Sequence, residues 1–477
     1  MRILRAELDK GTVTEEVFSR KDFACPGGAG LVTEYLAKRL RETGGKFSPL
    51  VIATGLFTGT RLAGASIAAM GWAGPSGEVN VSVFGGDCAS RLTDHEVKLI
   101  SLEGVSPGPV CLHIASDGKA SLTDASALEG RGTLSTVRKL RELYGERSSV
   151  LCCGPSAQSC GAISCVVCTD PDPALPPRQA SPGGMGRAFS ERNLTAVVTE
   201  HSPRPFRISF CGREKERFDL LSDTVNSALG SDSLTGRLLP LYGPLPGGWD
   251  SSPWRELSPE LSGGGEDREK AAWREKILSS GGFCSMSCIP GCTVRCSNSI
   301  RDPKGAYLST GLDHETAFLF GSMAGIFGLR DICAIDSLCT DAGCDLIMTG
   351  QILGELAKAG VVPFGDAAGT KRLLRGISGP GSALQRYLSE NGSLPLPSGL
   401  PQTGIKRGYR PEAGGSSSAC FMCPFPWRAI MKDPSAADAL RELASLMGWE
   451  ADSAFPSSLE ETVSSFARSI RECFSEN

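Results

Sequence analysis

The sequence lacks a run of apolar residues that could cross a bilayer, and it lacks an excess of basic residues. A membrane-spanning helix needs about 20 consecutive, mainly apolar residues, so we expect no membrane association. The formal net charge is −4, which offers no basic surface to a phosphate backbone, and nucleic acid is therefore not an expected partner. No apolar signal core follows residues 1–5, so we expect a cytoplasmic protein.

Histidine is scarce, whereas cysteine is abundant: the chain has 4 histidines and 19 cysteines. An odd number of cysteines without a secretion signal disfavours a disulfide framework and favours reduced thiols or metal ligation. We therefore hypothesise a strongly reducing or anaerobic cell, in which thiols and metal clusters escape oxidation.

The cysteine-rich stretch at residues 282–296 organises the rest of the chain. Its thiols recur every fourth residue, at Cys284, Cys288, Cys292 and Cys296. Pro290 and Gly291 interrupt regular structure between them, so we predict a compact loop rather than a strand. A loop that gathers thiolates can bind a metal centre.

Zinc and an iron–sulfur cluster compete for this loop. Structural zinc sites usually combine two separated pairs of Cys or His, but this loop is a single group and contains none of the histidines. An iron–sulfur cluster is often bound by one group of cysteines and one distant cysteine. The spacing therefore favours the cluster and predicts a further ligand near residue 420. Elsewhere, Cys165 and Cys168 would point to opposite faces of a regular strand, so we interpret them as small buried residues.

The pattern of apolar residues divides the chain into a β-rich first part and a helical second part. We predict strands at 2–8, 12–18, 50–55, 79–84, 97–102, 110–115, 119–122, 148–153, 162–168 and 194–198. We predict helices at 31–40, 133–144, 313–327, 330–339, 345–359, 371–376 and 383–388, and two more that begin at Asp433-Pro434 and at Ser457. A chain of 477 residues exceeds one typical core. The predicted fold class is α+β, with domains at 1–205, 206–390 and 391–477.

Two local patterns leave alternatives open. The glycine-rich segment 26–30 precedes a predicted helix and is either an anion-binding loop or a plain tight turn. An apolar stripe from Leu459 to Phe474 is either core or a partner-binding face, and core is the preferred interpretation.

Several separated stretches together resemble the tungsten-dependent aldehyde:ferredoxin oxidoreductases. They are RILRAEL, GGAGL, GLFTGT, LHIASDGKASLTDASALEGRGT and RQASPGGMGRAFSERNLTAVV in the first half, and LDHETAFLFGSMAGI, AGCDLIMTGQILGELAKAG and FGD in the second. The resemblance implies an N-terminal β-rich domain followed by helical domains. It also implies tungsten held by two pterin dithiolenes beside a [4Fe–4S] cluster. The implied reaction oxidises an aldehyde or oxo group to a carboxylic acid, with electrons leaving to ferredoxin.

The resemblance implies four cluster ligands, namely Cys284, Cys288, Cys292 and Cys423. The first is displaced by one residue from the family's spacing, and Cys420 and Cys296 remain alternatives for the fourth. Glu315 aligns with a glutamate near the family's metal, so we expect it to accept a proton from the substrate; the alternative is an acid favoured by a helix N-terminus.

The expected pterin site departs from the family's pattern. Thr340 and Ser418 stand where the family has aspartates, Asp345 matches the second acid of the first motif, and neighbouring Asp341 is a candidate replacement. Glycine loops can hold pterin phosphates and Mg²⁺ through backbone groups. We assign that role to Asn80 and to a loop that contains Gly183, Gly184 and Gly186.

The family's active-site histidine lies in a segment that this chain lacks, since no histidine follows His314. The leading hypothesis is a divergent, shortened family member that uses ferredoxin or another electron carrier and a small aldehyde; a homodimer is the candidate assembly. The alternatives are a non-catalytic paralogue that serves as an electron-transfer or partner subunit, and a zinc-stabilised structural protein.

Overall fold

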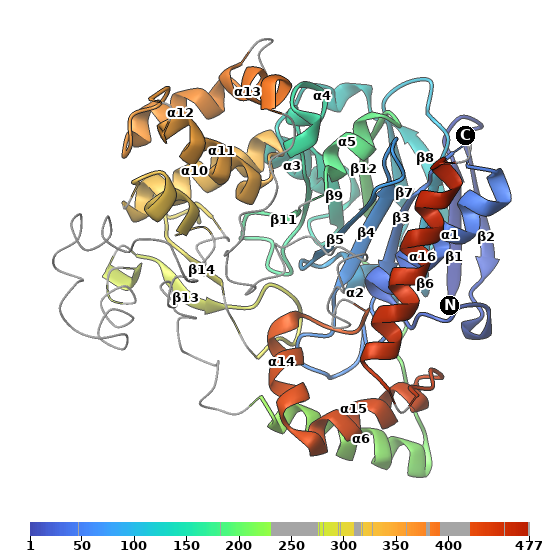
Figure 1. The fold of residues 1–477 in the computed structure, drawn as a ribbon. Coiled ribbons are helices and arrows are strands. Elements are labelled where there is room, and N and C mark those ends of the chain that lie inside the picture. Colours follow the sequence, from blue (N-terminus) through green and yellow to red (C-terminus); the bar gives the residue numbers. More distant parts are fainter. Residues whose placement is uncertain are drawn as a thin grey trace.

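Two six-stranded sheets form the first part of the molecule (Figure 1). The computed structural model describes residues 1–229, 275–309, 316–377, 382–391 and 420–475, apart from positions 46, 182, 276, 280, 294, 296, 317, 327, 359 and 453. The first sheet has the order β2-β1-β6-β3-β4-β5. In this sheet β1 and β6 run parallel, and all other neighbouring strands are antiparallel. Its strands are β1 (Arg2–Glu7), β2 (Thr12–Val17), β3 (Leu50–Thr54), β4 (Ala68–Ala73), β5 (Val79–Phe84) and β6 (Val97–Glu103).

The second sheet has the order β11-β10-β9-β12-β7-β8, in which only β12 and β7 run parallel. Its strands are β7 (Val110–Ile114), β8 (Ala120–Asp124), β9 (Ser149–Cys153), β10 (Val166–Cys168), β11 (Arg178–Ala180) and β12 (Leu194–Thr199). One buried cluster, which includes Leu4, Ile52, Leu112 and Val197, lies between the sheets. The strands are mostly apolar on both faces because helices cover the outer faces as well.

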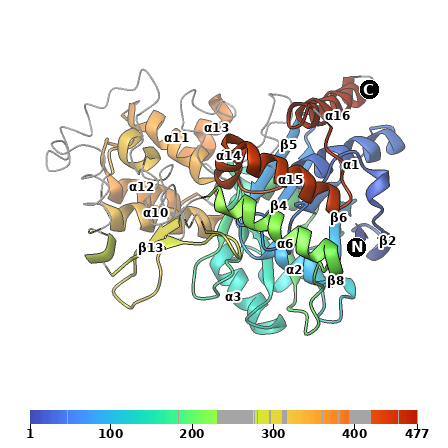
Figure 2. The ribbon, with the colours of Figure 1, turned by 90° about the horizontal axis from the view of Figure 1, so that it is seen from below.

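Helices from both ends of the sequence cover the outer face of the first sheet. The helix α1 (Gly28–Thr43) packs against α16 (Ser457–Ser475), and α6 (Gly212–Ser227) packs against α15 (Pro434–Leu446). Figure 2 shows α6 and α15 side by side. The C-terminal segment 420–475 therefore shares one buried cluster with the N-terminal sheet. Leu459, Val463 and Ile470 lie in that cluster, which confirms that the apolar stripe is core.

The remaining helices complete the two outer layers and a separate helical part. On the second sheet, α3 (Thr133–Tyr144) covers the outer face. Around 316–377 a different buried cluster forms, seen at the upper left of Figure 1. These helices are η1 (Arg20–Asp22), α2 (Cys88–Asp94), η2 (Ser126–Leu128), α4 (Ser156–Ser159), η3 (Gly161–Ile163), α5 (Met185–Ser190), η4 (Phe318–Met323, a π-helix), α10 (Leu329–Ala342), α11 (Leu346–Lys358), α12 (Ala367–Arg375), α13 (Ala383–Asn391) and α14 (Pro424–Lys432).

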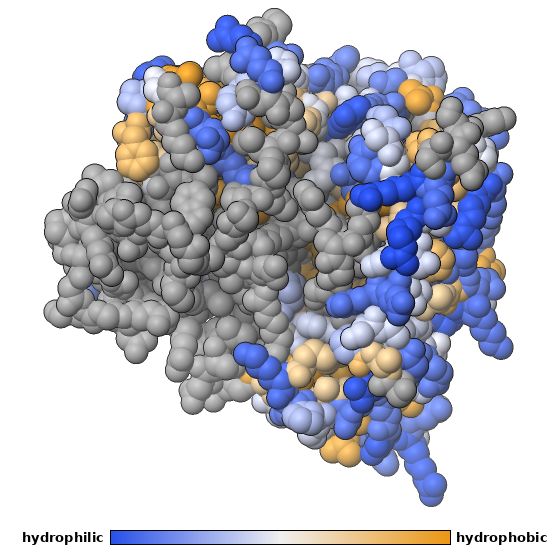
Figure 3. All heavy atoms as spheres, in the orientation of Figure 1, coloured by the Kyte–Doolittle hydropathy of each residue, from blue (hydrophilic) through white to orange (hydrophobic). Residues whose placement is uncertain are grey.

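The α+β class is confirmed: a β-rich N-terminal part is followed by mainly helical segments. Among the described residues, no helix is long and apolar enough to span a membrane. The visible surface over α16 is mainly hydrophilic (Figure 3). Cys165 and Cys168 are buried, 1% and 0% exposed, which confirms their interpretation as small core residues.

Candidate functional site

The predicted cysteine loop is held at both ends by a pair of short strands. The strands β13 (Phe283–Met286) and β14 (Ser297–Ser299) are antiparallel. The prediction of a loop throughout was therefore wrong for its first residues, because Cys284 lies within β13. The reason is the turn at Pro290 and Gly291: Gly291 adopts a φ of 73°, the chain reverses, and the flanking residues can pair.

The loop rests on the end of β5. The Gly86 N–H donates to the Cys288 carbonyl over 2.7 Å, and the Ser287 hydroxyl donates to the Cys292 carbonyl over 2.8 Å. Cys288 and Cys292 are 7% and 5% exposed. A Cβ placed on Gly85 would lie 2.9 Å from the Cys288 carbonyl oxygen, so the absence of a side chain there lets the backbone of the loop approach the sheet.

A buried arginine ties the loop to the second sheet. Arg178, on β11, donates from Nη1 to the Ser297 Oγ (2.8 Å) and from Nη2 to the Ser287 carbonyl (3.4 Å), and its Nε pairs with Asp170. The side chains of Arg178 and Asp170 are 10% and 1% exposed. Burial raises the pKa of Asp170, and Arg178 opposes that shift. The loop thus has a fixed positive charge beside it, which sequence reasoning missed although Arg178 opens the quoted RQASPGGMG run.

Two candidate fourth ligands, Cys423 and Cys420, lie in different surroundings. Cys423 is 2% exposed and precedes α14, and both Cys423 and Cys420 belong to the same buried cluster as Cys288 and Cys292. Cys420 packs against α1: a Cβ on Gly30 would lie 2.7 Å from its Sγ. Burial raises the pKa of Cys420 to about 12, as it does for Cys153 and Cys344, so the packing on α1 is the feature that favours Cys423 over Cys420.

Other predicted residues fall outside what the structure describes. The side chains of Cys284 and Cys296 and all of Glu315 lie outside the described residues. Within the described part of the chain, no three His, Cys, Asp or Glu side chains form a group suited to a single metal ion. A metal-binding group that includes the Cys284 thiol would lie partly outside the described residues.

The predicted glycine loop lies where the edges of the two sheets meet, since β11 packs against β5. A Cβ on Gly183 would lie 3.7 Å from the Asn80 Cβ, so these two predicted residues are neighbours. Gly183 and Gly184 adopt φ values of 116° and 62°. Their N–H groups donate to no residue in the described part of the chain, whereas the Gly183 carbonyl accepts from Trp72 Nε1 over 3.1 Å. Successive free N–H groups in this conformation suit an anion.

Gly186 has a different environment from the other two glycines. A Cβ there would lie 2.7 Å from the Ser164 Cβ, so this glycine permits close packing of α5 on the segment before β10. Gly27, in the 26–30 segment, also permits close packing, because a Cβ added there would lie 2.6 Å from the Leu56 backbone nitrogen. The observed packing favours the tight-turn interpretation of that segment.

The predicted acidic residues cap helices. The Asp345 Oδ1 accepts from the N–H groups of Ile347 (2.8 Å) and Met348 (3.1 Å) at the start of α11. The Asp341 Oδ1 accepts from the Leu134 N–H (3.0 Å) at the start of α3. Each carboxylate thus satisfies N–H groups that a helix leaves without intrahelical partners.

Thr340, where an aspartate was expected, is also bonded within the chain. Its hydroxyl accepts from Gln179 Nε2 over 3.2 Å, and its carbonyl accepts from the Thr133 hydroxyl over 2.7 Å. The Oε1 of Gln179 accepts from the Leu346 N–H over 3.0 Å. A neutral amide therefore joins Thr340 to the N-terminus of α11, and this role of Gln179 was not predicted.

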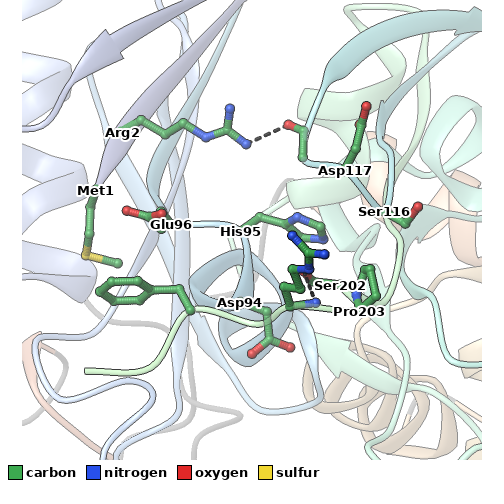
Figure 4. A pocket seen from close by; sticks show the side chains of 12 residues that line it. Met1, Arg2, Asp94, His95, Glu96, Ser116, Asp117, Ser202 and Pro203 are labelled. Carbon is green, nitrogen blue, oxygen red and sulfur yellow. Dashed lines mark hydrogen bonds between the residues drawn. The ribbon is translucent and has the colours of Figure 1, made fainter. Parts of the chain in front are cut away.

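A cavity of about 640 Å³ lies elsewhere, at the junction of the two sheets (Figure 4). Arg2 crosses it and donates to the Gly118 carbonyl over 2.6 Å, and the ring Nε2 of His95 donates to the Glu200 carbonyl over 2.8 Å. Among the described residues, no cysteine lines this cavity, so it is separate from Cys288 and Cys292.

Two family models match the chain. Residues 3–201 match the N-terminal domain of aldehyde ferredoxin oxidoreductase, and residues 253–385 match domains 2 and 3 of the same family. The tungsten-containing aldehyde ferredoxin oxidoreductase of Pyrococcus furiosus is 24% identical over 364 residues, which are 74% of this chain and 57% of that protein. The chain thus spans little more than half the length of this relative.

A solved structure has the same fold. It is described as the active site complex BamBC of benzoyl coenzyme A reductase with 1,5-dienoyl-CoA, and it superposes with a TM-score of 0.62 at 19% identity. The match covers 92% of this chain and 64% of that one. Two sheets followed by helical segments are thus an arrangement already known in a redox protein.

Proposed function

The chain belongs to the aldehyde ferredoxin oxidoreductase family, and from this premise we propose that it is an iron–sulfur oxidoreductase of that type. It oxidises an aldehyde or oxo group to a carboxylic acid and passes electrons through a [4Fe–4S] cluster to ferredoxin or a similar carrier. The observation that carries the proposal is the burial of Cys288 and Cys292 in one cluster with Cys420 and Cys423, although the latter two are distant in sequence.

The proposed cluster ligands are Cys284, Cys288, Cys292 and Cys423. Buried thiols suit this group, because a cluster excluded from water is protected and its potential is set by local charge and hydrogen bonds. When bound, the cluster supplies one-electron transfer. The fixed charge of Arg178, held by Asp170, balances part of the negative charge that four thiolates bring to the loop.

The proposed tungstopterin site uses the other predicted residues. The N–H groups of Gly183 and Gly184 beside Asn80 fit a phosphate, whereas Mg²⁺ would be held by phosphate and backbone carbonyl oxygens. Tungstopterin supplies the two-electron oxidation when it is bound. Asp341 and Asp345 fit less well, since each already caps a helix. Glu315 is the proposed proton acceptor.

A second candidate is a partner or electron-transfer subunit that keeps the cluster without tungstopterin. It is favoured by Thr340, which replaces an expected carboxylate and is bonded to Gln179. This neutral pair offers a pterin no carboxylate at that position.

Elemental analysis of protein purified without oxygen separates these candidates. The enzyme proposal predicts about four iron and four sulfide per chain, together with tungsten or molybdenum and a pterin. Full iron without tungsten, molybdenum or pterin would reject the enzyme and support the subunit. Zinc in place of iron would reject both.

A further inference from the structure

A second pocket, of about 200 Å³, lies at the adjoining ends of β3 and β6. Met1 and Phe206 line both this pocket and the larger cavity of Figure 4. The C-terminal end of α15 closes one side through Met447. None of the described residues of the two proposed cofactor sites lines it, so its contents require a separate explanation.

Lys98 is the unusual residue of this pocket. It is 2% exposed, and its neighbours along β6, Val97 and Leu99, are both buried. The register of β1 against β6 slips here, from Val97 opposite Arg2 to Leu99 opposite Ile3. The slip leaves Lys98 as an extra residue, a bulge of the kind that turns a side chain toward a site.

The Lys98 ammonium group is only partly satisfied by the chain. Its Nζ donates to the Thr54 carbonyl over 2.9 Å and to the Gly55 carbonyl over 2.8 Å. An ammonium has three N–H groups, so one is left without an acceptor among the described residues. The Thr54 hydroxyl also lies at the pocket, buried and without a hydrogen-bond partner in the part of the chain that the structure describes.

Arg20 supplies a second cation to the same pocket. Its Nη1 donates to the Pro26 carbonyl, and its guanidinium carbon lies 5.4 Å from the centre of the Phe18 ring. Neither Arg20 nor Lys98 forms a salt bridge with any described carboxylate. Burial lowers the pKa of Arg20 to about 10 and lowers the pKa of Lys98 well below its usual value, and the charge of Arg20 adds to the latter shift.

A buried lysine and a half-buried arginine without an acid are unfavourable as cations in an empty pocket, because a charge removed from water needs an opposite charge beside it. A bound anion would provide that charge. The rest of the lining is largely apolar, with Leu56, Phe206, Ile208 and Met447, and so suits an apolar body attached to a single anionic group. The small volume excludes a nucleotide.

We propose that this pocket binds the carboxylate of a small apolar organic acid, with Lys98 and Arg20 as its cationic partners. The guanidinium fork matches the two oxygens of a carboxylate, and the free Lys98 N–H and the Thr54 hydroxyl are further donors. An acid bound here contacts both the N-terminal sheet and α15.

The pocket adjoins the segment of the proposed fourth cluster ligand. The Leu56 N–H, on the pocket's wall, donates to the Cys420 carbonyl over 3.1 Å. Binding is therefore expected to stabilise the attachment of the 420–475 segment to the N-terminal sheet, whatever reaction the protein performs.

Calorimetry and thermal unfolding of the full chain with n-butyrate, butyramide or inorganic phosphate test the proposal. We expect butyrate to bind and to raise Tm, and the neutral isostere butyramide to do neither. Lys98→Met and Arg20→Gln should each weaken butyrate binding by about tenfold or more, the loss of one charge-assisted bond. Lys139→Met is the matched control, because Lys139 is an exposed residue of α3 that pairs with Glu142.

Several results would overturn the proposal. Equal binding of butyramide and butyrate would mean that only the apolar wall matters, and stronger binding of phosphate would exclude a carboxylate site. Unchanged butyrate affinity in Arg20→Gln would also refute the proposal. The Arg20→Gln variant alone is enough for this test if Lys98→Met does not fold. Absence of any butyrate binding to the wild-type protein would also refute the proposal.

Discussion

Two adjacent residues of β11, Arg178 and Gln179, reach two regions that differ in charge: the first region contains a buried ion pair, and the second contains a neutral amide. Arg178 reaches the cysteine loop, where it bonds Ser287 and is held by buried Asp170. Gln179 reaches the start of α11, where a neutral amide bonds Thr340. Neighbouring side chains of a strand point to opposite faces, so one short strand separates a cationic side from a neutral one.

The difference teaches which half of the expected redox site the chain retains. On the cysteine side, a cation stands beside buried thiols, an arrangement that gains most when the thiols become thiolates. On the Gln179 side, the carboxylate of Asp345 caps a helix and the amide of Gln179 completes the cap. The retained side is the one that we propose binds a cluster, and the altered side is the one that would bind a pterin.

The largest expected effect comes from replacing Cys423. We expect Cys423→Ser to reduce the iron content from about four atoms per chain to less than half of that, because serine is a poor ligand for iron–sulfur clusters. Iron and acid-labile sulfide assays after anaerobic purification measure this loss.

Cys420→Ser is the matched control, since Cys420 is another buried thiol of the same segment. It should keep its iron, because its Sγ packs against Gly30 and Cys25. Loss of iron in Cys420→Ser with retention in Cys423→Ser would reverse the assignment of the fourth ligand.

The next effect concerns the buried ion pair of the cysteine side. Arg178→Met leaves Asp170 charged and 1% exposed, so we expect the free energy of unfolding to fall by about 3–5 kcal/mol. Urea unfolding measures it, and the double variant with Asp170→Asn should recover part of the loss. If the double variant loses as much free energy of unfolding as the two single variants together, Arg178 does not stabilise the cysteine loop through Asp170.

Asp87 follows Gly86, which bonds the cysteine loop, and we expect it to make the free energy of unfolding depend on pH. Burial raises its pKa from 3.8 to about 6, although the Ser149 and Thr169 hydroxyls that bond it favour the ionised form. Because the folded pKa is the higher one, the stabilising contribution of the neutral carboxyl is present below about pH 4 and is lost as the pH rises through 6. The free energy of unfolding should therefore fall by about 2–3 kcal/mol across this range from Asp87 alone.

Asp87→Asn tests that contribution, because asparagine keeps the shape of the side chain and does not titrate. The variant should show a flatter profile of unfolding free energy between about pH 4 and 7. A profile identical to that of the wild-type protein would mean that Asp87 is not shifted.

The smallest expected effect concerns the region around Gln179, at the start of α11. Asp345→Ala removes the cap of α11 and should cost about 1 kcal/mol, whereas Asp345→Asn should cost little because asparagine caps equally well. Thermal unfolding measures both variants. Tungsten content distinguishes the roles: if Asp345→Asn keeps its stability but loses tungsten, the residue binds the pterin in addition to capping.

Local patterns were sufficient for many elements of the fold. The strand Val79–Phe84 and the helix Thr133–Tyr144 were predicted with their observed bounds, since alternation and helical spacing are properties of short segments. The strand β4 and the helix α6 were missed. β4 is buried on both faces and contains Ala, Gly and Trp without alternation, and α6 has few apolar residues apart from those it packs on α15.

The site was less predictable because its key contacts are long-range. The resemblance favoured Cys423 and kept Cys420 as an alternative, and the packing of Cys420 on α1 is a long-range contact that neither position reveals in the sequence. Lys98 lies in no motif, and Arg178 opens a quoted run without any sign that it is charged beside the cysteine loop. Their importance depends on what surrounds a buried charge, which no local pattern reveals.

The most direct test of the comparison is the metal content of the wild-type protein purified without oxygen. The cysteine side as described predicts about four iron and four acid-labile sulfide per chain, with the spectroscopic signal of a [4Fe–4S] cluster on reduction. Stoichiometric zinc, or no metal with all thiols free to react on unfolding, would contradict it.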